Sequence, residues 1–123
     1  MKYCTVINCM DGRTQSVVNE YLKERFKVEF VDTITEPGPN RILAERSQPV
    51  LVESIMSRLE ISLREHQSVG VAVVGHHDCA GNPAAEDEQI RHIKHAVRFI
   101  RTRHEGVNVI GLWVNERWEV EEV

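Results

Sequence analysis

The apolar positions along the chain follow two spacings, one typical of strands and the other of helices. Short runs of apolar or β-branched residues predict strands at residues 1–8, 27–34, 69–75, 107–114 and 117–123. The run VGVAVVG at 69–75 is continuously apolar between two glycines. That pattern is typical of a strand that is buried on both faces of a sheet.

Helical spacing recurs between these runs. Apolar residues three and four positions apart predict helices over residues 14–26, 49–66 and 82–106. In the last of these, we expect Asn82 to be the N-cap residue and Pro83 to lie in the first turn. Each of the three helices would present one apolar face to a sheet.

The segment TEPGPNRILAERS, residues 35–47, predicts a long loop rich in proline and glycine. Long loops in small domains are often functional, so it is a candidate functional loop. The element order then predicts a single α/β domain over residues 1–123. We expect a three-layer sandwich whose central sheet has four parallel strands and an antiparallel edge strand, with a hairpin at Asn115–Glu116.

Composition narrows the class of protein. A chain of 123 residues with 41% hydrophobic and 28% charged residues is typical of a soluble globular domain. A net charge of −4 and the lack of a Lys/Arg block argue against nucleic-acid binding. The N-terminal MKYCTVINCM is too short and too polar for a signal peptide or membrane span. Three cysteines cannot all pair within one chain, so we expect a reduced, cytoplasmic protein.

Chemically reactive residues gather directly after two of the predicted strands. CMDGR (9–13) follows the first strand, and HHDC (76–79) follows the apolar strand at 69–75. Residues two apart on an extended chain point the same way, so Cys9, Asp11 and Arg13 are expected to face one side. Because parallel sheets collect their chemistry at the carboxyl ends of strands, we expect the two segments to meet.

The combined segments predict a zinc site. The spacing of His76 and Cys79 lets both side chains reach one metal ion, and Cys9 adds a second thiolate. Three protein ligands leave a fourth position for water, which is the pattern of catalytic zinc sites. Taken separately, Cys9 would more often be a buried packing residue, and a single His-x-x-Cys is a weak signal.

At this point the sequence resembles a known family, the β-class carbonic anhydrases. The family's Cys-x-Asp-x-Arg and Gly-His-x-x-Cys motifs are matched here by Cys9, Asp11, Arg13, Gly75, His76 and Cys79. The resemblance covers most of the chain, and Cys4, which has no place in the motif, is expected in the core. Where the family carries an Arg-x-x-Gly-Asn-like segment, this chain has TEPGPN, in which only Gly38 and Asn40 correspond. We expect no counterpart of the family's N-terminal helical arm in these residues, and the predicted connection between the third and fourth strands is short for the family.

The resemblance implies Zn²⁺-dependent, reversible hydration of carbon dioxide to bicarbonate. It also implies that Asp11 either hydrogen-bonds the catalytic hydroxide or becomes the fourth zinc ligand. Arg13 would decide between these roles, because a bidentate Asp–Arg pair holds the carboxylate away from the metal. The alternative is that Asp11 and Arg13 are ordinary turn and helix-start residues. The family further implies a homodimer or a larger even-numbered oligomer.

Other functions stay open at this stage. The same scaffold could hydrolyse carbonyl sulfide or carbon disulfide, or it could bind zinc without catalysis. Thiol redox chemistry through Cys9 and Cys79 is less consistent with the sequence, because there is no Cys-x-x-Cys pair and His76 would have no role.

Several residues beside the motifs have more than one possible role. His77 and Asp78 could support the ligands or relay protons, or they could lie in a solvated loop. Gln15 could donate a hydrogen bond to substrate or face water. Trp113 and Trp118 are expected to be core residues or anchors of a dimer interface.

Overall fold

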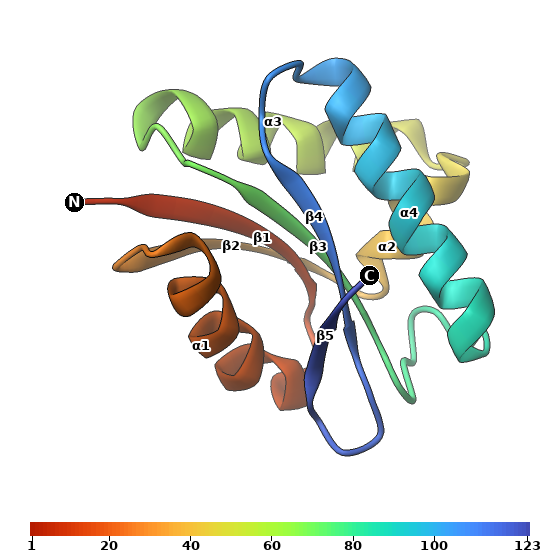
Figure 1. Cartoon of the computed structure of the whole chain (residues 1–123). Helices are drawn as coiled ribbons and strands as arrows, with labels where there is room; N and C mark the ends of the chain where they lie inside the picture. Colours follow the sequence, from red (N-terminus) through yellow and green to blue (C-terminus); the bar gives the residue numbers. More distant parts are fainter.

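Five strands form one sheet in the order β2-β1-β3-β4-β5 in the computed structural model, which describes residues 1–123 (Figure 1). The strands are β1 (Tyr3–Cys9), β2 (Phe30–Glu36), β3 (Val71–His76), β4 (Val109–Val114) and β5 (Val120–Glu122). The first four are parallel to one another, and β5 is antiparallel to β4. The predicted α/β class, with a mainly parallel sheet and an antiparallel edge strand, is confirmed.

Helices cover both faces of the sheet (Figure 1). They are α1 (Gln15–Phe26), which follows a 3₁₀ turn at Gly12–Thr14, α2 (Pro39–Glu45), α3 (Pro49–Glu65) and α4 (Glu86–Arg103). The core cluster on one face contains residues of α1, and the larger cluster on the other face contains residues of α2, α3 and α4. The result is the expected three layers. None of these helices combines the length and apolar character needed to cross a bilayer.

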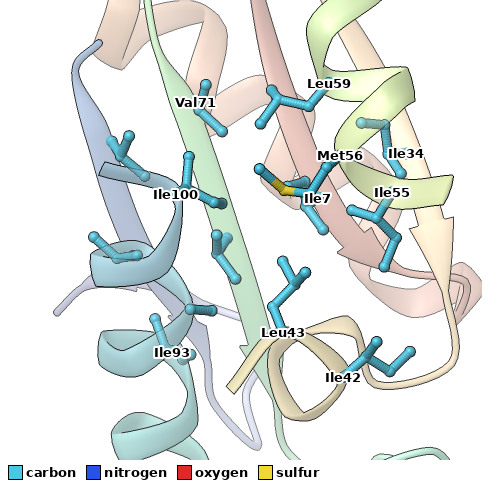
Figure 2. Packing of buried hydrophobic residues seen from close by; sticks show 14 of the residues in the cluster. Ile7, Ile34, Ile42, Leu43, Ile55, Met56, Leu59, Val71, Ile93 and Ile100 are labelled. Carbon is cyan, nitrogen blue, oxygen red and sulfur yellow. The ribbon is translucent and has the colours of Figure 1, made fainter. Parts of the chain in front are cut away.

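The alternation of side chains along the strands produces the two cores. In β1, Ile7 belongs to the cluster with α2, α3 and α4, whereas Cys4 and Val6 belong to the cluster with α1. All residues of β3 and β4 are buried, as predicted for strands covered on both faces. Figure 2 shows the larger cluster, in which Ile7 and Val71 from the sheet meet side chains of the helices, among them Leu43, Met56, Leu59, Ile93 and Ile100.

The direction of strand order reverses between β1 and β3. From β1 the chain passes through α1 on one face to β2, and it returns to β3 through α2 and α3 on the other face. At such a point the connecting segments diverge and leave a crevice at the carboxyl ends of the two strands. Those ends are Cys9 and His76.

The prediction of a loop over residues 35–47 is wrong, because this segment contains α2. Gly38, with φ of 61°, ends the extended chain, and Pro39 occupies the first helical turn. Proline is favourable there because its missing N–H has no helical partner to lose. Ile42 and Leu43 then pack into the core, which stabilises a helix of only seven residues. Proline and glycine therefore mark a helix start here.

The last helix begins later than predicted. It starts at Glu86, after an extended Ala85, and Asn82 is not its N-cap residue. Instead the side chain of Asn82 is buried and donates to Oδ1 of Asn40 at 3.3 Å. A tertiary hydrogen bond has therefore replaced the expected local cap.

Strand boundaries also differ from the prediction, most of all at β2 and β5. β2 spans Phe30–Glu36, two to three residues later than the predicted 27–34. The final strand has only three residues, Val120–Glu122, because Trp118 has φ of 60° and belongs to the preceding turn.

Candidate metal centre

The ends of two neighbouring parallel strands place the first two predicted metal ligands. Cys9 is the last residue of β1 and His76 is the last residue of β3. Cys79 returns to them from the turn that follows β3. One ligand atom from each of the three residues lies within 4.8 Å of the others, and all three residues are buried. The structure thus brings together Cys9, His76 and Cys79, as the sequence predicts.

The spacing of the two sulfur atoms is compatible with zinc. Sγ of Cys9 and Sγ of Cys79 are 3.8 Å apart, and both cysteines are free. A disulfide needs a separation of about 2.05 Å. Two sulfurs bound to a tetrahedral zinc at about 2.3 Å lie roughly 3.8 Å apart. The pair therefore has the separation that a shared zinc ion requires.

His76 presents an unused lone pair to this cluster. Its Nδ1 donates to the carbonyl oxygen of His77 at 2.7 Å, so the hydrogen is on Nδ1 and Nε2 carries the lone pair. Nε2 is buried and has no hydrogen-bond partner. Buried polar atoms are rarely left in this state, and metal-binding histidines typically donate their other N–H to a backbone carbonyl. The residues present therefore fit a zinc ion.

One of the two thiols, that of Cys9, lies in an environment that favours thiolate. A hydrogen bond from Cys79 lowers the pKa of Cys9, and the same interaction raises the pKa of Cys79, which keeps the shared proton. Backbone N–H groups also donate to the sulfurs, and such donors favour the charged form. Those N–H groups belong to Gly38 and Asp11 at Cys9, and to Gly81 and Asn82 at Cys79.

Cys4 shows the contrasting case. It is fully buried in the core between the sheet and α1, as expected. Burial, with a smaller contribution from the charge of Asp32, raises the pKa of its thiol to about 11. Cys4 therefore stays protonated and packs as a small apolar side chain.

Close packing of two glycines brings the N–H donors to the sulfurs. A Cβ on Gly81 would lie 2.4 Å from the carbonyl carbon of Pro37, and a Cβ on Gly38 would lie 2.7 Å from the carbonyl carbon of Gly81. No side chain fits in either place. The loops after β2 and β3 can therefore touch backbone to backbone beside the cluster.

A network of buried amides supports the loop that carries His76 and Cys79. Nε2 of Gln89 donates to the carbonyl oxygen of His76 at 2.8 Å and to that of Asn82 at 3.1 Å. Nδ2 of Asn40 donates to Oε1 of Gln89 at 3.2 Å. Gln89 is 1% exposed. Sequence reasoning missed this residue, although its place one helical turn before Ile93 on the apolar stripe of α4 was a usable signal.

Asp11 and Arg13 form a tight pair beside the cluster. Oδ1 of Asp11 accepts from the backbone N–H of Arg13 at 2.9 Å and from its Nε at 3.1 Å, and Oδ2 accepts from Nη2 at 2.7 Å. These hydrogen bonds lower the pKa of Asp11 to about 2, so the carboxylate is ionised. It lies outside the group of ligand atoms formed by the cysteines and His76.

The expected alternation of Cys9, Asp11 and Arg13 along an extended chain is wrong. The strand ends at Cys9, and Asp11 is the N-cap residue of the 3₁₀ turn that contains Arg13. The turn folds Arg13 back onto Asp11, and this is why the two side chains are in contact. Gln15 supports the turn, since its Nε2 donates to the carbonyl oxygens of Cys9 and Asp11 at 2.8 and 2.9 Å.

Two more residues complete the surroundings of Arg13. Asp78 accepts from Nη1 through Oδ2 at 3.3 Å and from Nη2 through its carbonyl oxygen at 3.1 Å. The guanidinium carbon lies 4.4 Å from the centroid of the Trp118 ring. The other tryptophan, Trp113, is 2% exposed and belongs to the core.

Comparison with known proteins agrees with this geometry. Residues 1–123 match a family model described as "Putative carbonic anhydrase". A search of curated protein sequences gave no significant match.

Three solved structures share the fold. A carbonic anhydrase from Glaciozyma antarctica has a TM-score of 0.58 at 17% identity, over 96% of this chain and 80% of that chain. One of two tetrameric β-carbonic anhydrases from Sordaria macrospora has a TM-score of 0.55 at 12% identity, over 99% of this chain and 80% of that chain. The β-carbonic anhydrase CafA of Aspergillus fumigatus has a TM-score of 0.55 at 14% identity, over 99% of this chain and 75% of that chain. Since the family model matches the whole chain, this protein belongs to the carbonic anhydrase-like family that the model describes.

Proposed function

We propose that this protein is a zinc-dependent carbonic anhydrase that interconverts carbon dioxide and bicarbonate. The observation that carries the proposal is the buried cluster of Cys9, His76 and Cys79, in which Nε2 of His76 has a lone pair and no partner. Membership of the family supports the choice of reaction.

The three residues supply a donor set that matches zinc in charge and number. Cys9 and Cys79 as thiolates balance the charge of Zn²⁺, and neutral His76 is the third donor. When bound, zinc supplies a Lewis acid that lowers the pKa of water from about 15.7 toward about 7 in favourable sites. Cys9, His76 and Cys79 would hold the ion, and a water molecule would complete its coordination.

Asp11 is the residue that would accept a hydrogen bond from the nucleophilic water and orient it. Its ionised carboxylate would accept a hydrogen bond from the attacking water and so orient that water toward the carbon of CO₂. Arg13 engages both carboxylate oxygens of Asp11. The same pairing would keep the carboxylate from binding the metal as a further ligand.

Metal content and CO₂ hydration test the proposal together. We expect about one zinc per chain in the purified protein, and stopped-flow hydration of CO₂ above the buffer rate by the zinc-loaded form. Cys9→Ser and Cys79→Ser should lose zinc and hydration, because each removes one ligand of the site. Cys4→Ala is the matched control: it removes a cysteine remote from the cluster and should keep both properties.

Two results would contradict the proposal, each in a different part. Zinc content like that of the wild type in both ligand variants would exclude this metal centre. A zinc-loaded wild type that does not hydrate CO₂ would exclude the reaction and leave a zinc-binding relative without this catalysis.

A further inference from the structure

The turn between β4 and β5 contacts the Asp11–Arg13 pair through Trp118. Trp118, in that turn, lies with its ring 4.4 Å from the guanidinium carbon of Arg13. At this distance the cation is attracted to the electron-rich face of the indole. The rings of His76 and His77 lie 6.3 and 6.4 Å from the Trp118 ring, so the indole also borders the metal cluster.

Arg13 is thereby held by three separate segments. The turn after β1 supplies the Asp11 carboxylate, and the turn after β3 supplies both the carboxylate and the carbonyl oxygen of Asp78. The β4–β5 turn supplies the indole of Trp118. The N–H groups at the edge of the guanidinium donate the hydrogen bonds, and the Trp118 ring lies against its planar face. These contacts therefore do not compete with one another.

The backbone of the β4–β5 turn holds Trp118 in an unusual conformation. Its φ of 60° is uncommon for a bulky residue. The N–H of Trp118 donates to the carbonyl oxygen of Asn115 at 2.9 Å, and Oδ1 of Asn115 accepts from the N–H groups of Arg117 and Glu119 at 2.9 and 3.0 Å. A conformation of this kind persists only where its surroundings determine it. Asn115 thus forms a turn that directs the indole at Arg13.

We propose that Trp118, together with Asp78, is a positioning residue that holds Arg13, and through Arg13 the Asp11 carboxylate, beside the Cys9–His76–Cys79 cluster. This role rests on the proposed function only for its effect on catalysis, because the positioning itself is a property of the folded chain. The Arg13 side chain is 45% exposed. An exposed ion pair alone restrains such a side chain weakly, so the additional contacts determine where it stays.

Hydrogen exchange of the Arg13 Nε–H group, measured by ¹⁵N NMR on the zinc-loaded protein, tests the positioning directly. Nε–H donates to Asp11, so its exchange reports how often that contact opens. Trp118→Leu should speed the exchange by about twofold to fivefold, the change in population that a cation–π contact at a partly exposed site supports. Trp118→Phe retains an aromatic face and should stay closer to the wild type. Glu116→Gln, in the same turn and without a hydrogen bond to Arg13, is the matched control and should leave the exchange unchanged.

Asp78→Asn is a second route to the same result, and it covers the case in which Trp118→Leu disturbs folding. It removes the charge that faces Nη1 but keeps the carbonyl that faces Nη2. It should therefore also speed the exchange. Exchange like that of the wild type in both Trp118→Leu and Asp78→Asn would overturn the proposal.

A double-mutant cycle separates action through Arg13 from a general structural effect. If Trp118 acts through Arg13, Trp118→Leu should lower kcat for CO₂ hydration in the wild type but have no further effect in Arg13→Ala. Equal losses in both backgrounds would overturn the positioning role. A wild type without hydration would contradict the proposed function alone, while the Nε–H exchange would still decide the positioning.

Discussion

At the scale of single residues, Asp11 and Arg13 have different tasks although they lie two positions apart. Asp11 is an ionised acceptor paired with Arg13, and in the proposed function Arg13 would restrict what the carboxylate can reach. Removing either side chain should therefore change the site in a different way. Two predictions follow from this division.

Asp11→Asn keeps the size of the side chain but weakens its oxygen as an acceptor. We expect zinc to stay bound, because Asp11 lies outside the Cys9–His76–Cys79 group. CO₂ hydration should fall by about tenfold or more, as is typical when a positioned proton-handling group is lost. Stopped-flow hydration and metal analysis on the same preparation give both quantities. Unchanged hydration in an active protein would mean that Asp11 is only a turn residue.

Arg13→Ala should free the carboxylate of Asp11 to bind the metal as a fourth ligand. A crystal structure of the zinc-loaded variant should then show an Asp11 oxygen about 2.2 Å from the metal, and hydration should fall because water is displaced. Arg25→Ala removes an arginine that pairs with Glu122 and serves as the control. Full hydration in Arg13→Ala, with Asp11 still away from the metal, would refute the restraint.

At the scale of elements, the site depends on α4 as much as on the strands. Gln89, in the first turns of α4, donates to the carbonyl oxygen of His76 at the end of β3, and to those of Asn82 and Ala84 in the loop that carries Cys79. The polar side chain thus links a helix to a loop that has no regular structure of its own. Its removal should loosen that loop.

Gln89→Leu tests this link because it keeps the volume and removes the donors. The carbonyl oxygens of His76, Asn82 and Ala84 would lose the donor that the Gln89 side chain supplies. We expect the free energy of unfolding to fall by about 1–3 kcal/mol, the usual cost of leaving buried polar groups unpaired. Chemical denaturation measures it, and Lys94→Leu on the exposed side of α4 should change it by no more than about 0.5 kcal/mol. Similar values for the two variants would mean that Gln89 is not a structural link.

At the scale of the whole molecule, the outer surface of the chain is the feature that bears on assembly. The two terminal strands differ in this respect: every residue of β4 is buried, Trp113 included, whereas Val123, directly after β5, is 39% exposed. Other exposed apolar side chains include Phe30 on edge strand β2 (43% exposed), and Val50 (88%) and Ile61 (56%) on α3. The free edge of β2 also carries backbone groups without a strand partner.

From this surface we predict a homodimer or a larger even-numbered assembly. Association would cover apolar side chains that otherwise face water, and it would protect the sheet edge. The Sordaria macrospora β-carbonic anhydrases that share this fold are tetrameric. Light scattering on the zinc-loaded protein at micromolar concentration measures the state. A monomer throughout that range would contradict the prediction.

The sequence by itself determined the features that depend on local spacing. Alternation and continuous apolar runs indicated β1, β3 and β4, and helical spacing indicated α1 and α3, because each pattern reflects which side of an element faces the core. The strand-end position of Cys9 and His76, and the turn spacing to Cys79, were enough to predict that the three would meet. In a parallel sheet the carboxyl ends of neighbouring strands lie together whatever the connections between them.

Only the tertiary structure decided the features that depend on contacts between distant segments. Helix α2 exists because Ile42 and Leu43 are buried against the sheet, although its local sequence is typical of a loop. Gln89 and Trp118 entered the site because α4 and the β4–β5 turn bring them to residues 13 and 105 positions away in the sequence. Such pairings follow from strand order and layer packing, which local periodicity does not encode, so the partners of Arg13 and His76 became visible only in the folded chain.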